Sequence, residues 1–142
     1  MSSLRDLAEQ GFQLYNAGDV EGFVNSYTED ATLVNPFGTF EGRAAIREHW
    51  SREKAAFPDR AITLDVLVEQ GDTLADEWTF VGTHTGPLVM ADGTELPPTG
   101  KRIELKGMEL VQLRDGQIAV QHQYWDNMAV AGQLGVLPEA AT

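Results

Sequence analysis

The chain has 142 residues, of which 42% are hydrophobic and 23% are charged, which is ordinary for one globular domain that buries a core. Ten Lys and Arg against 22 Asp and Glu give a net charge of −12, so we expect no nucleic acid partner, because phosphate binding requires clustered basic side chains. Cysteine is absent, which excludes disulfide bonds, a thiolate nucleophile and thiolate metal ligands.

The beginning of the chain, "MSSLRDLAEQ", has no apolar h-region of the kind that a signal peptide contains. No apolar run approaches the roughly 18 residues that a membrane span requires. We therefore expect a cytoplasmic protein without a membrane partner. The chain contains no internal repeat and no long linker, so we predict one domain over residues 1–142.

Helical periodicity dominates the first part of the chain. Gly18 is typical of the end of one helix, and Asp19 is typical of the N-cap of the next. The expected elements here are helices over 4–15 and 20–27, a strand over 31–34 that stops at Asn35-Pro36, and a helix over 41–57.

From residue 62 onward the period changes to that of strands. Turns are predicted at Gly71-Asp72 and around Asp115-Gly116. The expected elements are strands over 62–70, 73–86, 101–113 and 117–126, a Gly/Pro-rich loop over 87–100, and a short closing helix over 127–135. Helices followed by antiparallel strands predict an α+β fold, with a curved antiparallel sheet wrapped on the N-terminal helices.

The segment "QHQYWDN" at 121–127 carries polar and aromatic residues on the last predicted strand. Strict alternation divides them between the two faces, with His122, Tyr124 and Asp126 on one face and Gln121, Gln123 and Trp125 on the other. Asp126 stands directly before the closing helix. It is therefore interpreted as an N-cap, as an acid–base group, or as both.

A curved sheet that is closed by helices leaves a cone, and a cone of this kind suits a small apolar organic ligand. A carboxyl group inside it has a raised pKa and exchanges a proton near neutral pH. Asp76, Glu109 and Asp126 are the candidates for this role. His49, His84 and His122 lie on separate elements without the spacing of a metal motif, so neither a metal nor any other cofactor is predicted.

Several short motifs occur in a characteristic order along nearly the whole chain: "YNAG", "NP", "GTHTG", "PPT", "DGQI" and "QLG". In this order and spacing they resemble the SnoaL-like polyketide cyclase family, which has the nuclear-transport-factor-like or ketosteroid-isomerase-like fold. The resemblance implies a cone-shaped α+β barrel, usually a dimer or tetramer. It also implies cofactor-free acid–base chemistry on polycyclic ketones, typically the closure of a ring by an intramolecular aldol step.

By this resemblance Tyr15 and Asn35 fall at pocket-lining positions, and Gln121 and Gln123 face the cavity. The predicted substrate-binding set is completed by Trp50, Trp78, His84 and Tyr124. The chain departs from the family at the catalytic aspartate of the last strand, where it has Gln123, or Tyr124 if the strand is shifted by one residue. Neither residue is a carboxylic acid.

The predicted catalytic residues are therefore Asp126, Glu109 and His122, with Asp126 preferred as the acid. The leading hypothesis is an enzyme that cyclises, isomerises or dehydrates a small apolar oxygenated ring substrate. A non-catalytic binding domain of the same fold is the alternative, which the missing aspartate favours. A third possibility is epoxide hydrolysis, which would require two carboxylates and an amide around one water.

Overall fold

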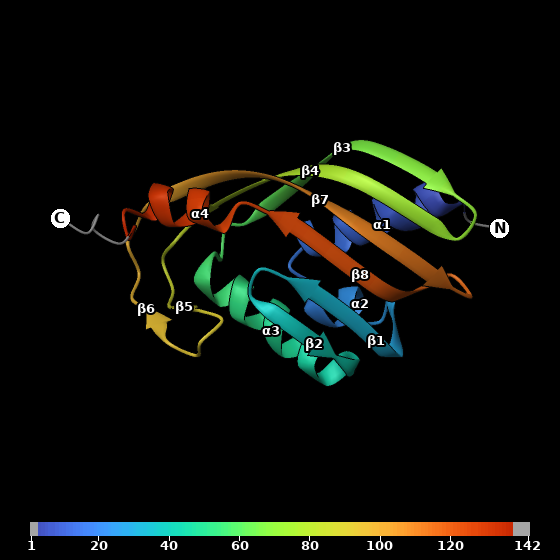
Figure 1. Ribbon diagram of the computed structural model, residues 1–142, viewed down its shortest axis with the longest axis horizontal. Coiled ribbons are helices and arrows are strands. Elements are labelled where there is room, and N and C mark those ends of the chain that lie inside the picture. The colour runs from blue at the N-terminus through green and yellow to red at the C-terminus, as the bar shows by residue number, and fades with distance from the viewer. Residues whose placement is uncertain (1–2, 138–142) are drawn as a thin grey trace.

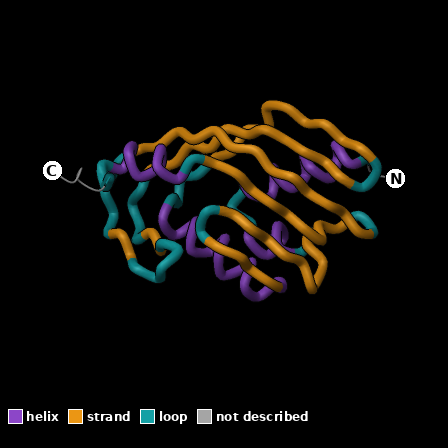
Figure 2. Tube along the Cα trace, in the orientation of Figure 1, coloured by secondary structure: helices purple, strands orange, loops and turns teal. Residues whose placement is uncertain are grey.

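One curved sheet with helices packed behind it forms the described part of the chain, residues 3–137 of a computed structural model (Figure 1). The elements in chain order are α1 (Leu4–Asn16), α2 (Val20–Val24), β1 (Tyr27–Asn35), β2 (Gly38–Glu41), α3 (Gly42–Ala56), β3 (Ala61–Gln70), β4 (Thr73–Thr83), β5 (Leu88–Val89), β6 (Glu95–Leu96), β7 (Arg102–Arg114), β8 (Gln117–Trp125) and α4 (Asn127–Leu134). Figure 2 shows the strands in one layer in front of the helices.

The strand order in the sheet is β2-β1-β8-β7-β4-β3. The predicted α+β class and the curved sheet wrapped on N-terminal helices are confirmed. The sheet is open and not a closed barrel, because β2 and β3 form its two edges. Its pairs are antiparallel with one exception, since β1 runs parallel to β8 and joins the first half of the chain to the last strand.

Tertiary pairing moves several predicted boundaries. Tyr27, expected at the end of a helix, begins β1 because it pairs with Ile118 of β8. The strand β2 was not predicted, since its four residues become a strand only by pairing with β1 across the turn after Asn35. The loop predicted over 87–100 contains the two short strands β5 and β6, which form an arm at one end of the molecule (Figure 1).

Side chains on the inner face of the sheet follow cross-strand rows. An aromatic row joins Trp78, Gly107 and Trp125, which are opposite one another on β4, β7 and β8. The next row joins Asp76, Glu109 and Gln123, and is polar. A third row joins Leu74, Val111 and Gln121. A polar row is thus built into an inner face that is otherwise mainly apolar.

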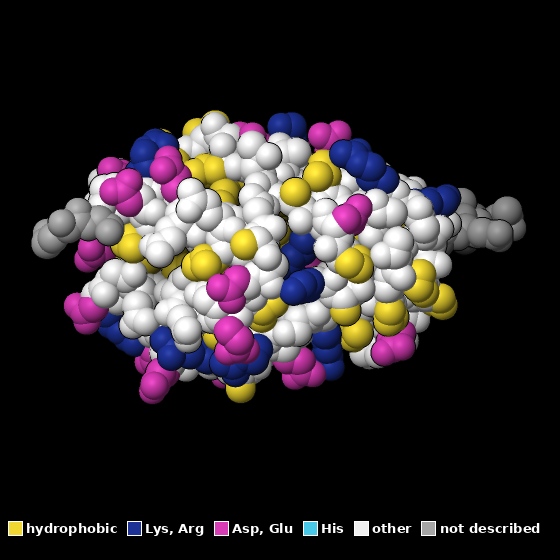
Figure 3. All heavy atoms as spheres, turned by 180° about the vertical axis from the view of Figure 1, so that it is seen from behind, with side chains coloured by type: hydrophobic (Ala, Val, Ile, Leu, Met, Phe, Trp, Pro, Cys, Tyr) yellow, Lys and Arg dark blue, Asp and Glu magenta, His cyan; other side chains and the backbone are white. Residues whose placement is uncertain are grey.

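The outer face of the sheet exposes large apolar side chains. Those of Met108 and Tyr124 are opposite one another and are 47% and 59% exposed. The same face carries Val66, Val68 and Leu110, which are also exposed. Val66 lies in the cross-strand row of Glu77, and Val68 and Leu110 lie in the row of Ala75. On the helix side, acidic, basic and apolar side chains are interspersed (Figure 3). None of the helices in the described residues has the length and apolarity that crossing a membrane requires.

Candidate active site

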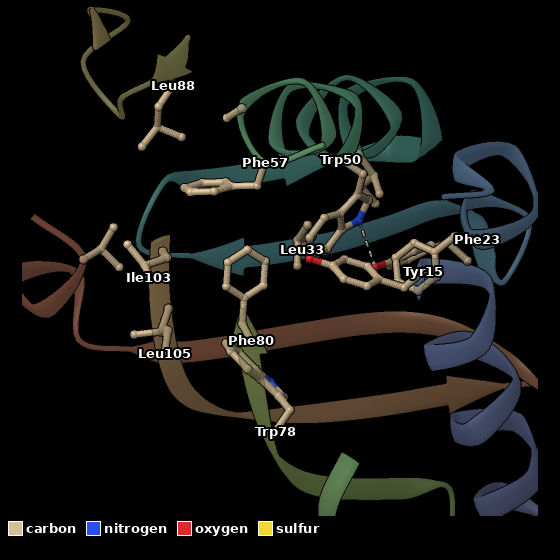
Figure 4. Packing of buried hydrophobic residues seen from close by; sticks show 14 of the residues in the cluster. Tyr15, Phe23, Leu33, Trp50, Phe57, Trp78, Phe80, Leu88, Ile103 and Leu105 are labelled. Carbon is tan, nitrogen blue, oxygen red and sulfur yellow. Dashed lines mark hydrogen bonds between the residues drawn. The ribbon is translucent and has the colours of Figure 1, made fainter. Parts of the chain in front are cut away.

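A cavity of about 520 Å³ lies between the inner face of the sheet, the helices and the β5–β6 arm. This volume falls in the range of small-molecule sites. Aromatic and aliphatic side chains make up most of the lining, and Figure 4 shows how those of Phe57, Trp78, Phe80 and Leu105 pack toward one another. The polar row interrupts this apolar lining, since Asp76, Glu109 and Gln123 all contact the cavity, as does Gln121 of the next row.

Glu109 is the centre of the polar row. Its side chain is buried, and its Oε1 accepts hydrogen bonds from Gln121 Nε2 at 3.0 Å and from Gln123 Nε2 at 3.1 Å. The pairing of β4 with β7 runs without a register shift past Gly107, so the strand keeps Glu109 on the inner face. The prediction that Glu109 points inward is therefore correct.

Both glutamines are held in this orientation by further hydrogen bonds. Asn35 Nδ2 donates to Gln123 Oε1 at 3.3 Å, and the hydroxyl of Tyr27 donates to Gln121 Oε1. Tyr27 in turn accepts from Trp50 Nε1 at 3.2 Å. Two chains of donors therefore converge on one carboxylate oxygen, which stabilises negative charge on Glu109.

Asp76 lies opposite Glu109 on the neighbouring strand. Burial, followed by the negative charge of Glu109 and the hydrogen bond between the two, raises the pKa of Asp76 to about 9. Burial also raises the pKa of Glu109, but hydrogen bonds from Gln123, Gln121 and Asp76 oppose this rise. Since the glutamine donors act on Glu109 alone, Glu109 loses its proton before Asp76 does.

Trp78 lies beside this carboxyl pair, two residues from Asp76 on the same face of β4. Its indole occupies the space that a side chain at Gly107 would fill, because a Cβ there would lie 2.4 Å from Trp78 Cζ2. Trp78 Nε1 and Asp76 Oδ1 are buried and have no hydrogen-bond partner among the described residues. A donor and an acceptor are thus left for a ligand at the edge of the polar row.

Gly107→Ala tests this packing. The added methyl group would displace the Trp78 ring, so we expect the free energy of unfolding to fall by about 1–3 kcal/mol. Gly11→Ala is the matched control, since its Cβ would lie 3.9 Å from Phe23 and alanine favours the helix. Urea denaturation of both variants measures the difference. Equal stability of the two would contradict this placement of Trp78.

A second buried polar cluster lies on α1, α3 and the segment that follows α3. The hydroxyl of Tyr15 donates to Glu53 Oε1, which also accepts from Arg60 at 2.9 Å. The guanidinium carbon of Arg60 lies 3.9 Å from the centre of the Tyr15 ring. Burial raises the pKa of Glu53, and the Arg60 charge opposes this rise. Tyr15 and Glu53 line the cavity. Because Arg60 pairs with Glu53, the negative charge of Glu53 is already balanced within the protein.

His49 is connected to the polar row through Asn35. Its Nε2 lies 3.1 Å from Asn35 Nδ2, and its ring stacks on Phe40. Burial, with smaller contributions from the Arg60 and Arg52 charges, lowers the pKa of His49 to about 3. The ring is therefore neutral at physiological pH, and its Nε2 accepts the amide hydrogen of Asn35. Asn35 itself is buried behind the cavity lining, between His49 and Gln123.

Five of the predicted site residues do not line the cavity: Asn35, which was predicted to line it, and Asp126, His122, Tyr124 and His84. The preference for Asp126 as the acid is corrected here. Asp126 is exposed and caps α4, accepting from the backbone N–H groups of Met128 at 2.9 Å and Ala129 at 3.2 Å. His122 and Tyr124 share the outer face, because alternation along β8 turns them away from Gln121 and Gln123.

His84, the last of these five residues, is fully buried at the base of the β5–β6 arm. Its Nδ1 accepts from the backbone N–H of Thr99 at 3.2 Å. It therefore fixes the arm and does not contact the cavity. Of the other predicted substrate-binding residues, those that line the cavity are Tyr15, Trp50, Trp78, Gln121 and Gln123.

Sequence reasoning left Asp76 out of the predicted site, although it was one of three candidate carboxyl groups. The alternation of β4 contains the signal, since Leu74, Asp76 and Trp78 share one face. Tyr27, Glu53 and Arg60 were also missed. Their positions depend on packing between helices and sheet, which no local pattern indicates.

Comparison with known proteins identifies the family. The model of the SnoaL-like domain matches residues 8–121, and the chain therefore belongs to the SnoaL-like family. No curated protein matches the chain in sequence.

Solved structures give the same fold. TsrD from Streptomyces laurentii is 27% identical with a TM-score of 0.81, over 94% of this chain and 96% of TsrD. IdmH from Streptomyces antibioticus, a proposed polyketide cyclase, is 28% identical with a TM-score of 0.75, over 93% and 98%. SalBIII, an epoxide hydrolase/cyclase-like enzyme in pyran ring formation of salinomycin, is 25% identical with a TM-score of 0.73, over 88% and 92%. The similar structures thus include small-molecule enzymes of the cyclase type.

Proposed function

We propose that the protein is a cofactor-free acid–base enzyme that closes or isomerises a small, apolar, oxygenated ring substrate. The observation that carries this proposal is the Asp76–Glu109 pair, two carboxyl groups that lie opposite one another and contact a mainly apolar cavity. Two carboxyl groups whose environments separate their protonation states can serve as acid and base in one reaction. The site therefore replaces the missing family aspartate with residues of two neighbouring strands.

In the proposed reaction Glu109 removes a proton from carbon next to a substrate carbonyl group. The C–H electron pair moves to form an enolate, whose oxygen accepts a hydrogen bond from Trp78 Nε1. The enolate carbon then attacks a second carbonyl carbon, and the new alkoxide takes the proton of Asp76. Transfer of a proton from Glu109 to Asp76 through their hydrogen bond restores the starting state. The pair carries one negative charge before and after the cycle.

Epoxide opening is the second candidate function. The specific observation that favours it is that two side-chain amides, those of Gln121 and Gln123, donate to Glu109, with a second carboxyl group opposite at Asp76. In this reaction Glu109 takes the proton of a water or of a substrate hydroxyl as it attacks the epoxide carbon. Asp76 protonates the epoxide oxygen as the C–O bond breaks.

A carbon-acid probe tests the proposed base without knowledge of the substrate. 5-Nitrobenzisoxazole loses its ring C–H proton to a base, its N–O bond breaks, and a coloured cyanophenolate forms. We expect the protein to accelerate this reaction in a saturable manner, because a partly desolvated carboxylate is a stronger base than one in water. Binding of the probe without acceleration would favour the non-catalytic binding domain. Opening of styrene oxide in ¹⁸O-labelled water would favour the epoxide reaction.

The exposed apolar outer face also leads to a prediction of association as a dimer or tetramer. Val68 and Leu110 lie in one cross-strand row there, and a sheet face with such side chains is expected to bind a second copy. Sedimentation at micromolar concentration should show a species larger than 15.6 kDa, and Leu110→Glu should dissociate it. Glu77→Gln, on the same face, is the control. A monomer at all concentrations would contradict this prediction.

A further inference from the structure

The polar row divides the cavity into two apolar parts, and from this we infer the shape of the substrate. We propose that the site binds a two-armed molecule, with an oxygenated centre at Asp76 and Glu109 and an apolar arm on either side. The chemistry at the centre rests on the proposed function, whereas the binding of the two arms does not.

The length of the cavity is the first argument. Its lining includes residues of β7 from Ile103 to Leu113, with Glu109 between them. Strand residues are spaced by about 3.3 Å, so the ten steps from one to the other cover on the order of 30 Å along the curved strand. A compact single ring held at Glu109 would leave both ends of such a cavity without ligand contacts.

The first apolar part, called the arm-side lobe, lies toward the β5–β6 arm. It is lined by Phe57, Phe80, Leu88, Ile103 and Leu105. Figure 4 shows these side chains converging beyond Trp78, on the side away from Tyr15 and Phe23. Leu88 is 5% exposed, so the arm covers this lobe.

The second apolar part, called the helix-side lobe, lies on the other side of the polar row. Its apolar lining consists of Leu7, Gly11, Leu14, Phe23, Leu74 and Leu113, and Tyr15, Glu53 and Gln121 also contact the cavity on this side. Gly11 lines the cavity from α1, and a Cβ at this position would meet only Phe23, at 3.9 Å. The chain therefore leaves room at Gly11 that a larger helix-forming residue would fill.

The two lobes differ from the polar row in what they offer a ligand. In each lobe the apolar lining is hydrocarbon, which favours burial of an apolar arm by about 25 cal/mol for each Å². Between the lobes, Trp78 Nε1 and Asp76 Oδ1 lack hydrogen-bond partners within residues 3–137. A carbonyl oxygen of a ligand can accept a hydrogen bond from Trp78 Nε1, and a hydroxyl group of a ligand can donate one to Asp76 Oδ1. The order of these regions along the cavity therefore matches a ligand that has an apolar arm, an oxygenated centre and a second apolar arm.

Three β-diketones form the test series, because they share one enolisable centre. Dibenzoylmethane has two phenyl arms, benzoylacetone has one, and acetylacetone has none. Calorimetric titration should show a gain in affinity of about tenfold or more for each phenyl arm, since burial of one aromatic ring exceeds the 1.4 kcal/mol that corresponds to tenfold. Dibenzoylmethane that binds no more tightly than benzoylacetone would overturn the proposal.

Variants that fill one lobe at a time show where the arms lie. Gly11→Leu fills the helix-side lobe and Leu88→Trp fills the arm-side lobe. Each should weaken dibenzoylmethane about tenfold and leave benzoylacetone within about threefold, because its single arm can use the other lobe. If only one of the two variants weakens dibenzoylmethane, both arms lie in one lobe and the proposal is wrong. Leu14→Phe and Leu105→Phe replace any variant that does not fold.

Glu109→Gln separates this inference from the proposed function. The variant removes the base and keeps the lobes, so the order of the three affinities should persist while proton abstraction is lost. If the unmodified protein shows the affinity order but does not abstract protons, the two-armed site stands and the proposed reaction is wrong. If the unmodified protein abstracts protons but binds all three diketones equally, the proposed reaction stands and the two-armed site is wrong.

Discussion

Glu109→Gln is expected to lower the rate of proton abstraction by about two to four orders of magnitude, the usual contribution of a general base. Glutamine has nearly the size of glutamate, and its amide oxygen can accept from Gln121 and Gln123. The fold should therefore persist while the base is lost. Turnover of 5-nitrobenzisoxazole, with the melting temperature measured in parallel, gives the result.

Asp126→Asn is the matched control for this experiment. Asp126 caps α4 on the outside of the molecule, and asparagine caps a helix about as well. Its rate should stay within about twofold of the unmodified protein, since its side chain does not reach the cavity. Loss of activity in Asp126→Asn with full activity in Glu109→Gln would reverse the assignment of the base.

The pH dependence of the same rate provides a second test of the pair. Activity should rise with pH as Glu109 loses its proton, with a midpoint above the ordinary value for glutamate because burial raises its pKa. For a reaction that also needs the Asp76 proton, activity should fall again as the pH passes about 9. Asp76→Asn should slow such a reaction at every pH, whereas proton abstraction from 5-nitrobenzisoxazole, which needs only the base, should keep its acidic limb in this variant.

Asp76→Asn is also expected to change stability strongly, and in a direction that depends on pH. Burial raises the pKa of Asp76 from 3.8 to about 9 in the folded state. At pH values between 3.8 and about 9, Asp76 carries its proton in the folded state and has lost it in the unfolded state. Each pH unit in this window therefore lowers the free energy of unfolding by up to about 1.4 kcal/mol. Asparagine has no proton to lose, and its amide can still donate to Glu109.

Thermal melts at several pH values measure this effect. The two proteins should melt at similar temperatures near pH 4, and at pH 8 the variant should melt higher by about 5 °C or more. Glu77→Gln, an exposed neighbour on the outer face of β4, should follow the unmodified protein at both values. Parallel curves for Asp76→Asn and the unmodified protein would show that Asp76 is ionised in the folded state.

Local patterns in the sequence determined the longer elements and the faces of the strands, but not the short strands β2, β5 and β6. Period-two alternation on β8 correctly separated Gln121 and Gln123 from His122 and Tyr124, because side chains of a strand point alternately to its two faces. Asp126 before α4 was correctly interpreted as a cap, since capping needs only neighbouring backbone N–H groups. These features depend on contacts between residues that are close in sequence.

The tertiary structure decided which carboxyl groups meet. Asp76 and Glu109 lie opposite one another because β4 and β7 pair in a particular register, across 33 residues of sequence that include the β5–β6 arm. Which of the two keeps the proton depends on Gln121 and Gln123, which reach Glu109 from a third strand. Burial in a cavity closed by the helices then supplies the desolvation that raises both pKa values. Desolvation and long-range pairing are properties of the packed chain, so no local pattern of residues specifies them.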